Sequence, residues 1–258
     1  MSRNHFDHFL NQAKRAVLSA ADVVRTRRQV SSPIIEGHEA GGREIKLNLD
    51  RQLSELLISN LTRDGIRVIS EESEGSHAIT DDVVWIIDPL DGSFNYLRNA
   101  GPSAICCALL EKNSPVLGVI FDLSSNQLYW GGPAFGSFCD DSPLTVSRQT
   151  QLGSALVYTG LPSRMEVSST HSLDALTHLL RHAQKVRMIG SAAISLVKVA
   201  SGIGDLYSET SIMPWDVAAG VALVEGAGGL VLPGLASRST PINITAGNPE
   251  LVRLLSNR

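Results

Sequence analysis

The chain has 258 residues, of which 43% are hydrophobic and 19% are charged, and its formal net charge is −4. This length can bury a large core, either in one sizeable domain or in two smaller ones. The balanced charge without a long basic run argues against a nucleic-acid partner, and the lack of a long apolar run or a signal sequence argues against a membrane or secreted protein.

The first predicted element is a long helix from about Asn4 to Arg28, because apolar residues recur along it at steps of three and four. Arg25, Arg27 and Arg28 lie at its end, where positive charge suits the helix dipole. The segment 31–42 contains a proline and three glycines, which fits either a mobile loop over a site or a simple connector.

A second helix is predicted from about Leu49 to Arg63. Asp50 lies in its first turn, a position that the helix dipole alone would explain. A strand over Ile66–Ser70 then leads into three glutamates within four residues, the first of which is Glu71. This acidic cluster suits a solvated loop, and it also suits a metal site if other acids lie nearby.

A short apolar run from Val83 to Ile87 predicts a buried strand that leads directly into two carboxylates, Asp88 and Asp91. The proline between them restricts the backbone, so the chain leaves the strand along a rigid path. Gly92 can adopt a positive φ angle, and its N–H group and that of Ser93 would form an anion site if a helix begins there. The alternative is an ordinary turn that uses Asp and Gly.

Closely spaced apolar segments separated by turn residues follow, and this spacing predicts an antiparallel meander. The expected strands are Ala104–Leu110, Val116–Asp122, Gln127–Trp130, Phe135–Cys139 and Leu144–Val146. Three cysteines lie in these strands, at Cys106, Cys107 and Cys139. An odd count, with two adjacent residues in an apolar strand, indicates reduced thiols and hence a cytoplasmic protein.

After Val146 the predicted strands and helices alternate, which is typical of an α/β arrangement. The expected strands are Ser154–Tyr158, Val186–Ile189, Asp205–Ser208, Leu230–Leu232 and Ile242–Ala246, and the expected helices are Ser172–His182, Ser191–Ala200, Trp215–Gly226 and one that begins at Asn248-Pro249. His178 and His182 have metal-ligand spacing on a helix, but no third ligand is evident, so we interpret them as surface residues.

Asp216 lies at the start of a predicted helix, directly after Pro214 and Trp215. The helix dipole alone would favour an acid there, but the rigid entry also fits an acid aimed into a site. With it, the acids at the ends of strands and helices form a set of four: Glu71, Asp88, Asp91 and Asp216. Oxygen ligands suit Mg²⁺, Mn²⁺ or Ca²⁺ rather than zinc or copper. Two such ions about 4 Å apart can hold a phosphate and activate a water, which predicts metal-dependent hydrolysis of a phosphate ester.

The order and spacing of several motifs resemble those of the inositol monophosphatase family of Mg²⁺-dependent, lithium-sensitive phosphatases. The matching segments are Glu71–Ser73, Trp85–Tyr96, Gly190–Ala193, Asp205–Glu209 and Trp215–Gly229. The resemblance implies an α/β fold built as a layered αβαβα sandwich, with an α+β domain over residues 1–146 and an α/β domain over residues 147–258. It also implies a homodimer, and two or three Mg²⁺ ions per site that Mn²⁺ can replace.

The resemblance also assigns roles to the residues at matching positions. The metal ions would bind Glu71, Asp88, the carbonyl of Leu90, Asp91 and Asp216. Glu71 and Ser93 would orient the attacking water, with Asp50 behind Ser93. The substrate would contact Asp91, Gly92, Ser93, Gly190, Ser191, Ala192, Glu209 and Asp216.

The implied function is hydrolysis of inositol monophosphate or of a related polyol or sugar phosphate. Two alternatives remain open: a nucleotidase that removes the 3′-phosphate of adenosine 3′,5′-bisphosphate, and a catalytically silent regulatory or scaffold protein on the same fold. Three differences from the usual family pattern bear on the substrate. Ser93-Phe94 stands in place of two threonines, Ser70 in place of a glycine, and Lys46-Leu47 in place of a Val-Thr pair before Asp50.

Overall fold

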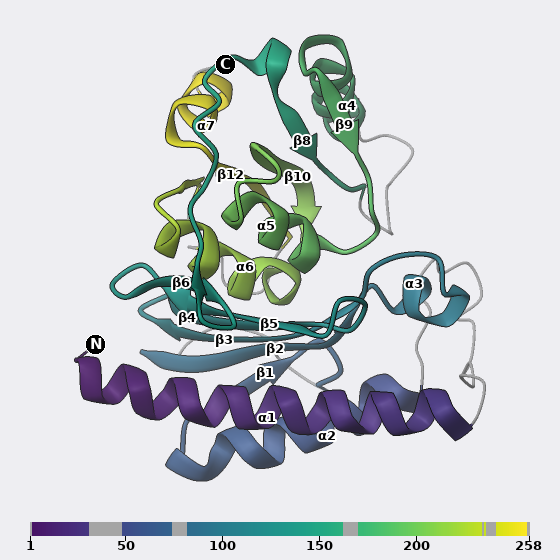
Figure 1. Cartoon of the computed structure of the whole chain (residues 1–258), viewed down its shortest axis with the longest axis vertical. Helices are drawn as coiled ribbons and strands as arrows, with labels where there is room; N and C mark the ends of the chain where they lie inside the picture. Colours follow the sequence, from purple (N-terminus) through teal and green to yellow (C-terminus); the bar gives the residue numbers. More distant parts are fainter. Residues whose placement is uncertain are drawn as a thin grey trace.

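The computed structural model describes residues 2–30, 48–73, 82–161, 170–233, 235 and 241–256. Its elements stack in five layers that alternate between helices and sheets (Figure 1). From bottom to top of the figure, the helical layers are α1 (Arg3–Val30) with α2 (Asn48–Leu61), α5 (Ala192–Ala200) with α6 (Pro214–Gly226), and α4 (Thr170–His182) with α7 (Pro249–Ser256). The α/β class and the αβαβα sandwich expected from the sequence are therefore confirmed.

Within the described residues, the lower sheet has seven strands in chain order, with β1 at one edge. β1 pairs in parallel with β2 and every later pair is antiparallel, so the predicted meander is confirmed. The strands are β1 (Val68–Ser70), β2 (Val83–Asp91), β3 (Ala104–Glu111), β4 (Ser114–Asp122), β5 (Gln127–Gly132), β6 (Gly136–Cys139) and β7 (Ser142–Pro143).

Two details of this sheet differ from the prediction. β2 does not end at Ile87 but continues to Asp91, with a shift in its pairing to β3 between Asp88 and Asp91. The predicted strand over Leu144–Val146 is wrong, because β7 ends at Pro143, before this segment. The N–H group of Leu144 still donates to the carbonyl oxygen of Ser137 in β6 at 2.8 Å, whereas that of Val146 donates to the carbonyl oxygen of Ala227, directly after α6, at 3.1 Å.

The upper sheet has five strands in the part of the chain that is described, in the order β11-β12-β10-β8-β9. The strands are β8 (Leu156–Tyr158), β9 (Lys185–Arg187), β10 (Leu206–Ile212), β11 (Leu230–Leu232) and β12 (Ile242–Gly247). β8 pairs in parallel with β9 and β10, whereas β12 is antiparallel to β10 and β11. The strands and helices predicted to alternate in this half are present, and the strands form a mixed sheet.

Alternating residues of β2 divide between two cores, since successive side chains point to opposite faces of a sheet. Val84 and Ile86 pack into a core that α5, α6 and the upper sheet share, and Trp85 and Ile87 pack into the core under α1 and α2. The predicted domain boundary at 146/147 lies between the two sheets. It stays a prediction, because the first core contains residues from both sides of it.

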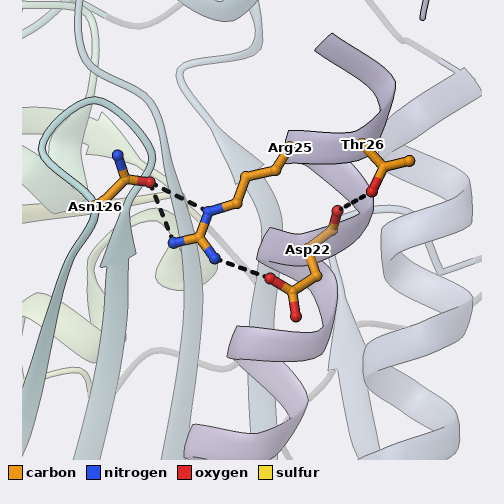
Figure 2. Close-up of polar contacts among 4 residues, drawn as sticks. All are labelled: Asp22, Arg25, Thr26 and Asn126. Atoms are coloured by element: carbon orange, nitrogen blue, oxygen red, sulfur yellow. Dashed lines mark hydrogen bonds and ion pairs between the residues drawn. The ribbon is translucent and has the colours of Figure 1, made fainter. Parts of the chain in front are cut away.

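Arg25 connects the C-terminal part of α1 to the lower sheet, as Figure 2 shows. Its Nε and Nη2 atoms lie 3.3 and 3.2 Å from Oδ1 of Asn126 in the turn between β4 and β5, and Nη1 lies 2.8 Å from Oδ1 of Asp22. The hydroxyl of Thr26 donates to the carbonyl oxygen of Asp22 at 2.9 Å. Arg25 therefore holds the helix against a turn, in addition to its expected effect on the helix dipole. None of the described helices combines the length and apolarity needed to cross a membrane.

Candidate active site

Three of the four predicted acids meet at one end of the lower sheet. Glu71 lies in the turn after β1, Asp88 lies in β2, and Asp216 lies in the first turn of α6. One carboxylate oxygen from each lies within 4.8 Å of those of the other two. The parallel pairing of β1 with β2 matches Ser70 with Ile87, so the next residues along the two strands, Glu71 and Asp88, are neighbours.

Asp216 has a local role as well as a place in this cluster. Pro214 begins α6, and the Asp216 carboxylate accepts the N–H group of Met213 at 3.3 Å, which caps the helix. The acid at this helix start therefore stabilises α6 and also lies in the three-acid cluster. The rigid helix start holds the carboxylate near Glu71 and Asp88.

Asp91 faces the start of α5 rather than the centre of the three-acid cluster. Its carboxylate accepts hydrogen bonds from the Ser191 hydroxyl and from the N–H groups of Ala192 at 3.3 Å and Ala193 at 3.2 Å. It lies close enough to Asp88 and Asp216 to raise the pKa of both. Asp91 therefore joins the lower sheet to the middle helical layer at the edge of the site.

The chain turns sharply at Gly92, whose φ angle is +76°, and α3 (Ser93–Arg98) begins directly after it. A Cβ atom at Gly92 would lie 2.8 Å from the carbonyl oxygen of Pro102, so no side chain fits there. The positive φ angle and the helix start predicted at this point are both confirmed. The Ser93 hydroxyl donates to the carbonyl oxygen of Leu90 at 2.8 Å. The charge of Asp50 contributes to the raised pKa of Asp88, so Asp50 lies near the site, and its place behind Ser93 stays a prediction.

Asn95 is a residue of α3 for which no role was predicted from the sequence. Its side-chain nitrogen lies 2.7 Å from the carbonyl oxygen of Ile189, 2.9 Å from that of Pro102 and 3.1 Å from that of Gly190. These contacts fix α3 against the segment that leads into α5. No local pattern could have shown this, since the two segments are far apart along the chain.

The predicted substrate side is formed by the start of α5 and by β10. Gly190 has a φ angle of +72°, and Ser191 caps α5 by accepting the N–H group of Ile194 at 3.1 Å. Glu209 lies in β10 and is buried. Burial raises the pKa of Glu209 to about 7, the Tyr207 hydrogen bond opposes the rise, and the charge of Asp91 adds to it. Ser191 contacts Asp91, and Glu209 lies close enough to Asp216 to raise its pKa; the contacts of both with a substrate stay predictions.

Burial and mutual repulsion dominate the electrostatics of the acids. Burial and the charges of Glu71 and the neighbouring acids raise the pKa values of Asp88 and Asp216 well above the usual range. Burial raises the pKa of Asp91 to about 6, although its hydrogen bonds to α5 oppose the rise. A hard divalent cation among these oxygens would relieve the repulsion, so the donor set fits Mg²⁺ or Mn²⁺.

Magnesium is expected to raise the unfolding temperature more at about pH 8 than at about pH 5.5. Because the pKa of Asp91 is raised to about 6 in the folded state, the metal-free fold binds more protons than the unfolded chain. That stabilising contribution is complete below about pH 4 and is lost as the pH rises through about 6. Thermal unfolding with Mg²⁺ and with a chelator at both pH values measures the difference. An equal shift at both values would contradict this electrostatic account.

Comparison with known proteins agrees with the geometry. The sequence profile of the inositol monophosphatase family matches residues 5–246. The chain is 30% identical to the Nus factor SuhB of Salmonella typhimurium over 251 residues, which cover 95% of this chain and 93% of that protein. It is 30% identical to an inositol-1-monophosphatase of Synechocystis over 241 residues, which cover 93% of this chain and 82% of that protein. The extragenic suppressor protein SuhB of Bartonella henselae has a solved structure that matches with a TM-score of 0.83 at 26% identity and covers 97% of both chains. The chain therefore belongs to the inositol monophosphatase family.

Proposed function

We propose that this protein is a Mg²⁺-dependent phosphomonoesterase that acts on inositol monophosphate or on a related polyol or sugar phosphate. The observation that carries the proposal is the set of three carboxylates, from Glu71, Asp88 and Asp216, whose oxygens lie within 4.8 Å of one another. The tight turn at Gly92, with the start of α3 beside it, supports a place for the phosphate. The name of the Synechocystis relative supports the same substrate class.

Each residue of the candidate site would have a defined role. Two or three Mg²⁺ ions, held by Glu71, Asp88, Asp91, Asp216 and the Leu90 carbonyl, would supply the positive charge that neutralises the phosphate and activates a water. Glu71 would accept a proton from that water, and the Ser93 hydroxyl, with Asp50 behind it, would orient it. The N–H groups of Gly92 and Ser93 would bind phosphate oxygens. Glu209, Asp91 and the start of α5 at Gly190–Ala192 would hold the alcohol part of the ester.

Phosphate release from a panel of esters tests the proposal. We expect Mg²⁺-dependent release from inositol 1-phosphate or from a related polyol or sugar phosphate, and none with a chelator present. The panel should also contain histidinol phosphate and adenosine 3′,5′-bisphosphate. Activity on adenosine bisphosphate alone would favour the nucleotidase, and no release from any ester would contradict a phosphatase.

A second candidate function is a regulatory role without catalysis. It is supported by the name of the Salmonella relative, a Nus factor. The complete set of carboxylates favours the enzyme, since a binding role alone does not require several acids gathered at one point. Calorimetry separates the two candidates, because a protein that binds neither Mg²⁺ nor Mn²⁺ would not be a metal-dependent phosphatase.

A homodimeric state, a cytoplasmic location and inhibition by lithium belong to the same proposal. The cytoplasmic location is supported by three cysteines that are free in the structure. We propose a small phosphorylated substrate as the partner, without nucleic acid or membrane. Sedimentation of the purified protein and assays with added lithium chloride test the dimer and the inhibition.

A further inference from the structure

The carboxylate of Glu209 is held by a tyrosine on the same strand. The Tyr207 hydroxyl donates to Oε2 of Glu209 at 2.7 Å. The two residues lie two positions apart in β10, so their side chains point to the same face of the sheet. Tyr207 is 0% exposed, so its ring cannot move away without disturbing the core. The hydrogen bond therefore fixes one oxygen of the carboxylate.

On another side, the same carboxylate occupies the space that the missing side chain of Gly160 leaves open. A Cβ atom at Gly160 would lie 2.3 Å from Oε2 of Glu209 and 2.7 Å from Oε1. The φ angle of Gly160 lies outside the left-handed region, so its backbone would accept alanine. Glycine is therefore required here for the room that it leaves to Glu209 and not for its backbone freedom.

The position of Gly160 against Glu209 is itself held by its neighbour. The hydroxyl of Thr159 donates to the carbonyl oxygen of Ser208 at 2.6 Å, and its N–H group donates to the carbonyl oxygen of Arg187 at 2.9 Å. These bonds tie the end of β8 to both neighbouring strands. The space around the Glu209 carboxylate is thus bounded by Gly160 at the end of β8 and by Tyr207 in β10.

We propose that Tyr207 and Gly160 are positioning residues that aim the Glu209 carboxylate at a hydroxyl group of the substrate's alcohol part. The proposal rests on the phosphatase function proposed above. The Tyr207 hydroxyl uses one lone pair of Oε2. The remaining lone pairs of the carboxylate can therefore accept a hydrogen bond from a substrate hydroxyl. Glu209 interacts electrostatically with both Asp91 and Asp216, which places it beside the acids of the site. Neither positioning residue touches the phosphate in this arrangement.

Two single variants, Tyr207→Phe and Gly160→Ala, test the proposal with two esters. Inositol 1-phosphate carries hydroxyls on its alcohol part, and 4-nitrophenyl phosphate carries none but has an activated leaving group that keeps turnover measurable. Each variant is expected to lower kcat/KM for inositol 1-phosphate by about tenfold, the size of one lost hydrogen bond to a charged group. The value for 4-nitrophenyl phosphate is expected to stay unchanged.

Matched controls separate positioning from general damage. Tyr158→Phe changes the β8 residue that pairs with Tyr207, and Gly153→Ala adds a Cβ atom that would lie 3.9 Å from its nearest neighbour, the carbonyl oxygen of His182. Both are expected to behave like the wild type with both esters. In a Glu209→Ala background, which lacks the acceptor of the Tyr207 hydroxyl, Tyr207→Phe should cause no further loss, because coupled residues are not additive. Thermal unfolding of each variant shows whether it is folded.

The outcomes distinguish the two proposals. A wild-type protein that releases phosphate from neither ester contradicts the phosphatase function itself. A wild-type enzyme whose variants lose both activities equally, or lose neither, contradicts the positioning role and leaves the phosphatase intact. Additive losses in the Glu209→Ala background would also overturn the positioning role.

Discussion

Replacing Asp88 with asparagine is expected to reduce Mg²⁺-dependent phosphate release by about a thousandfold or more, or about 4 kcal/mol in the barrier. Asp88 is 1% exposed, and one of its carboxylate oxygens lies within 4.8 Å of an oxygen of Glu71 and of Asp216. The change removes one negative charge from the metal centre but keeps the shape of the side chain. The amide oxygen of asparagine can still accept the Leu90 N–H group, which lies 3.0 Å from Oδ1 of Asp88.

The same variant separates a metal role from a structural one, because we expect it to lose activity and yet to be more stable than the wild type without metal. Burial and the charges of Glu71 and other acids raise the pKa of Asp88, so a neutral amide relieves repulsion in the metal-free fold. We expect the metal-free variant to unfold at a higher temperature than the metal-free wild type, and to gain less from Mg²⁺. Asp174→Asn, an exposed residue of α4, is the control. Near-normal turnover by the Asp88 variant at saturating Mg²⁺ would remove the basis of the proposed mechanism.

Gly118→Ala is expected to destabilise the fold by about 3 kcal/mol, at the upper end of the range for an overpacked core. The added Cβ atom would lie 2.2 Å from the carbonyl oxygen of Ala219 and 2.9 Å from its carbonyl carbon. Both are backbone atoms of α6, so they cannot swing away as a side chain would. Gly118 also lies in β4 between strands β3 and β5, which prevents the sheet from moving freely.

Urea unfolding of the Gly118 variant measures this loss, with Gly153→Ala as a glycine control whose added Cβ has room. Because α6 carries Asp216 one turn before Ala219, any shift of the helix also moves a carboxylate of the site. We therefore expect the folded fraction of the Gly118→Ala variant to bind Mg²⁺ with a lower affinity than the wild type. An unfolding free energy equal to that of the wild type would show that β4 and α6 separate easily, contrary to the packing described here.

Much of the fold could be predicted because its signals are local. The meander follows from short apolar strands with turn residues between them, and the start of α7 follows from Asn248, whose side chain accepts the N–H group of Glu250 at 2.9 Å. The failures are also explained by non-local contacts. Leu144–Val146 looks like a strand, but the N–H group of Val146 donates to the carbonyl oxygen of Ala227 after α6, and no pattern within the segment reveals that partner.

The sequence by itself determined which residue types are available and where they stand along the elements. Acids at the ends of β1 and β2 and at the start of α6, with a glycine that must turn at Gly92, were enough to predict a metal-dependent phosphatase site. Only the tertiary structure decided which acids meet. It brings Glu71, Asp88 and Asp216 together, turns Asp91 toward α5, and encloses Glu209 between Tyr207 and Gly160. The reason is that these contacts join residues distant along the chain, so they depend on how the sheets and helices pack and not on any local preference.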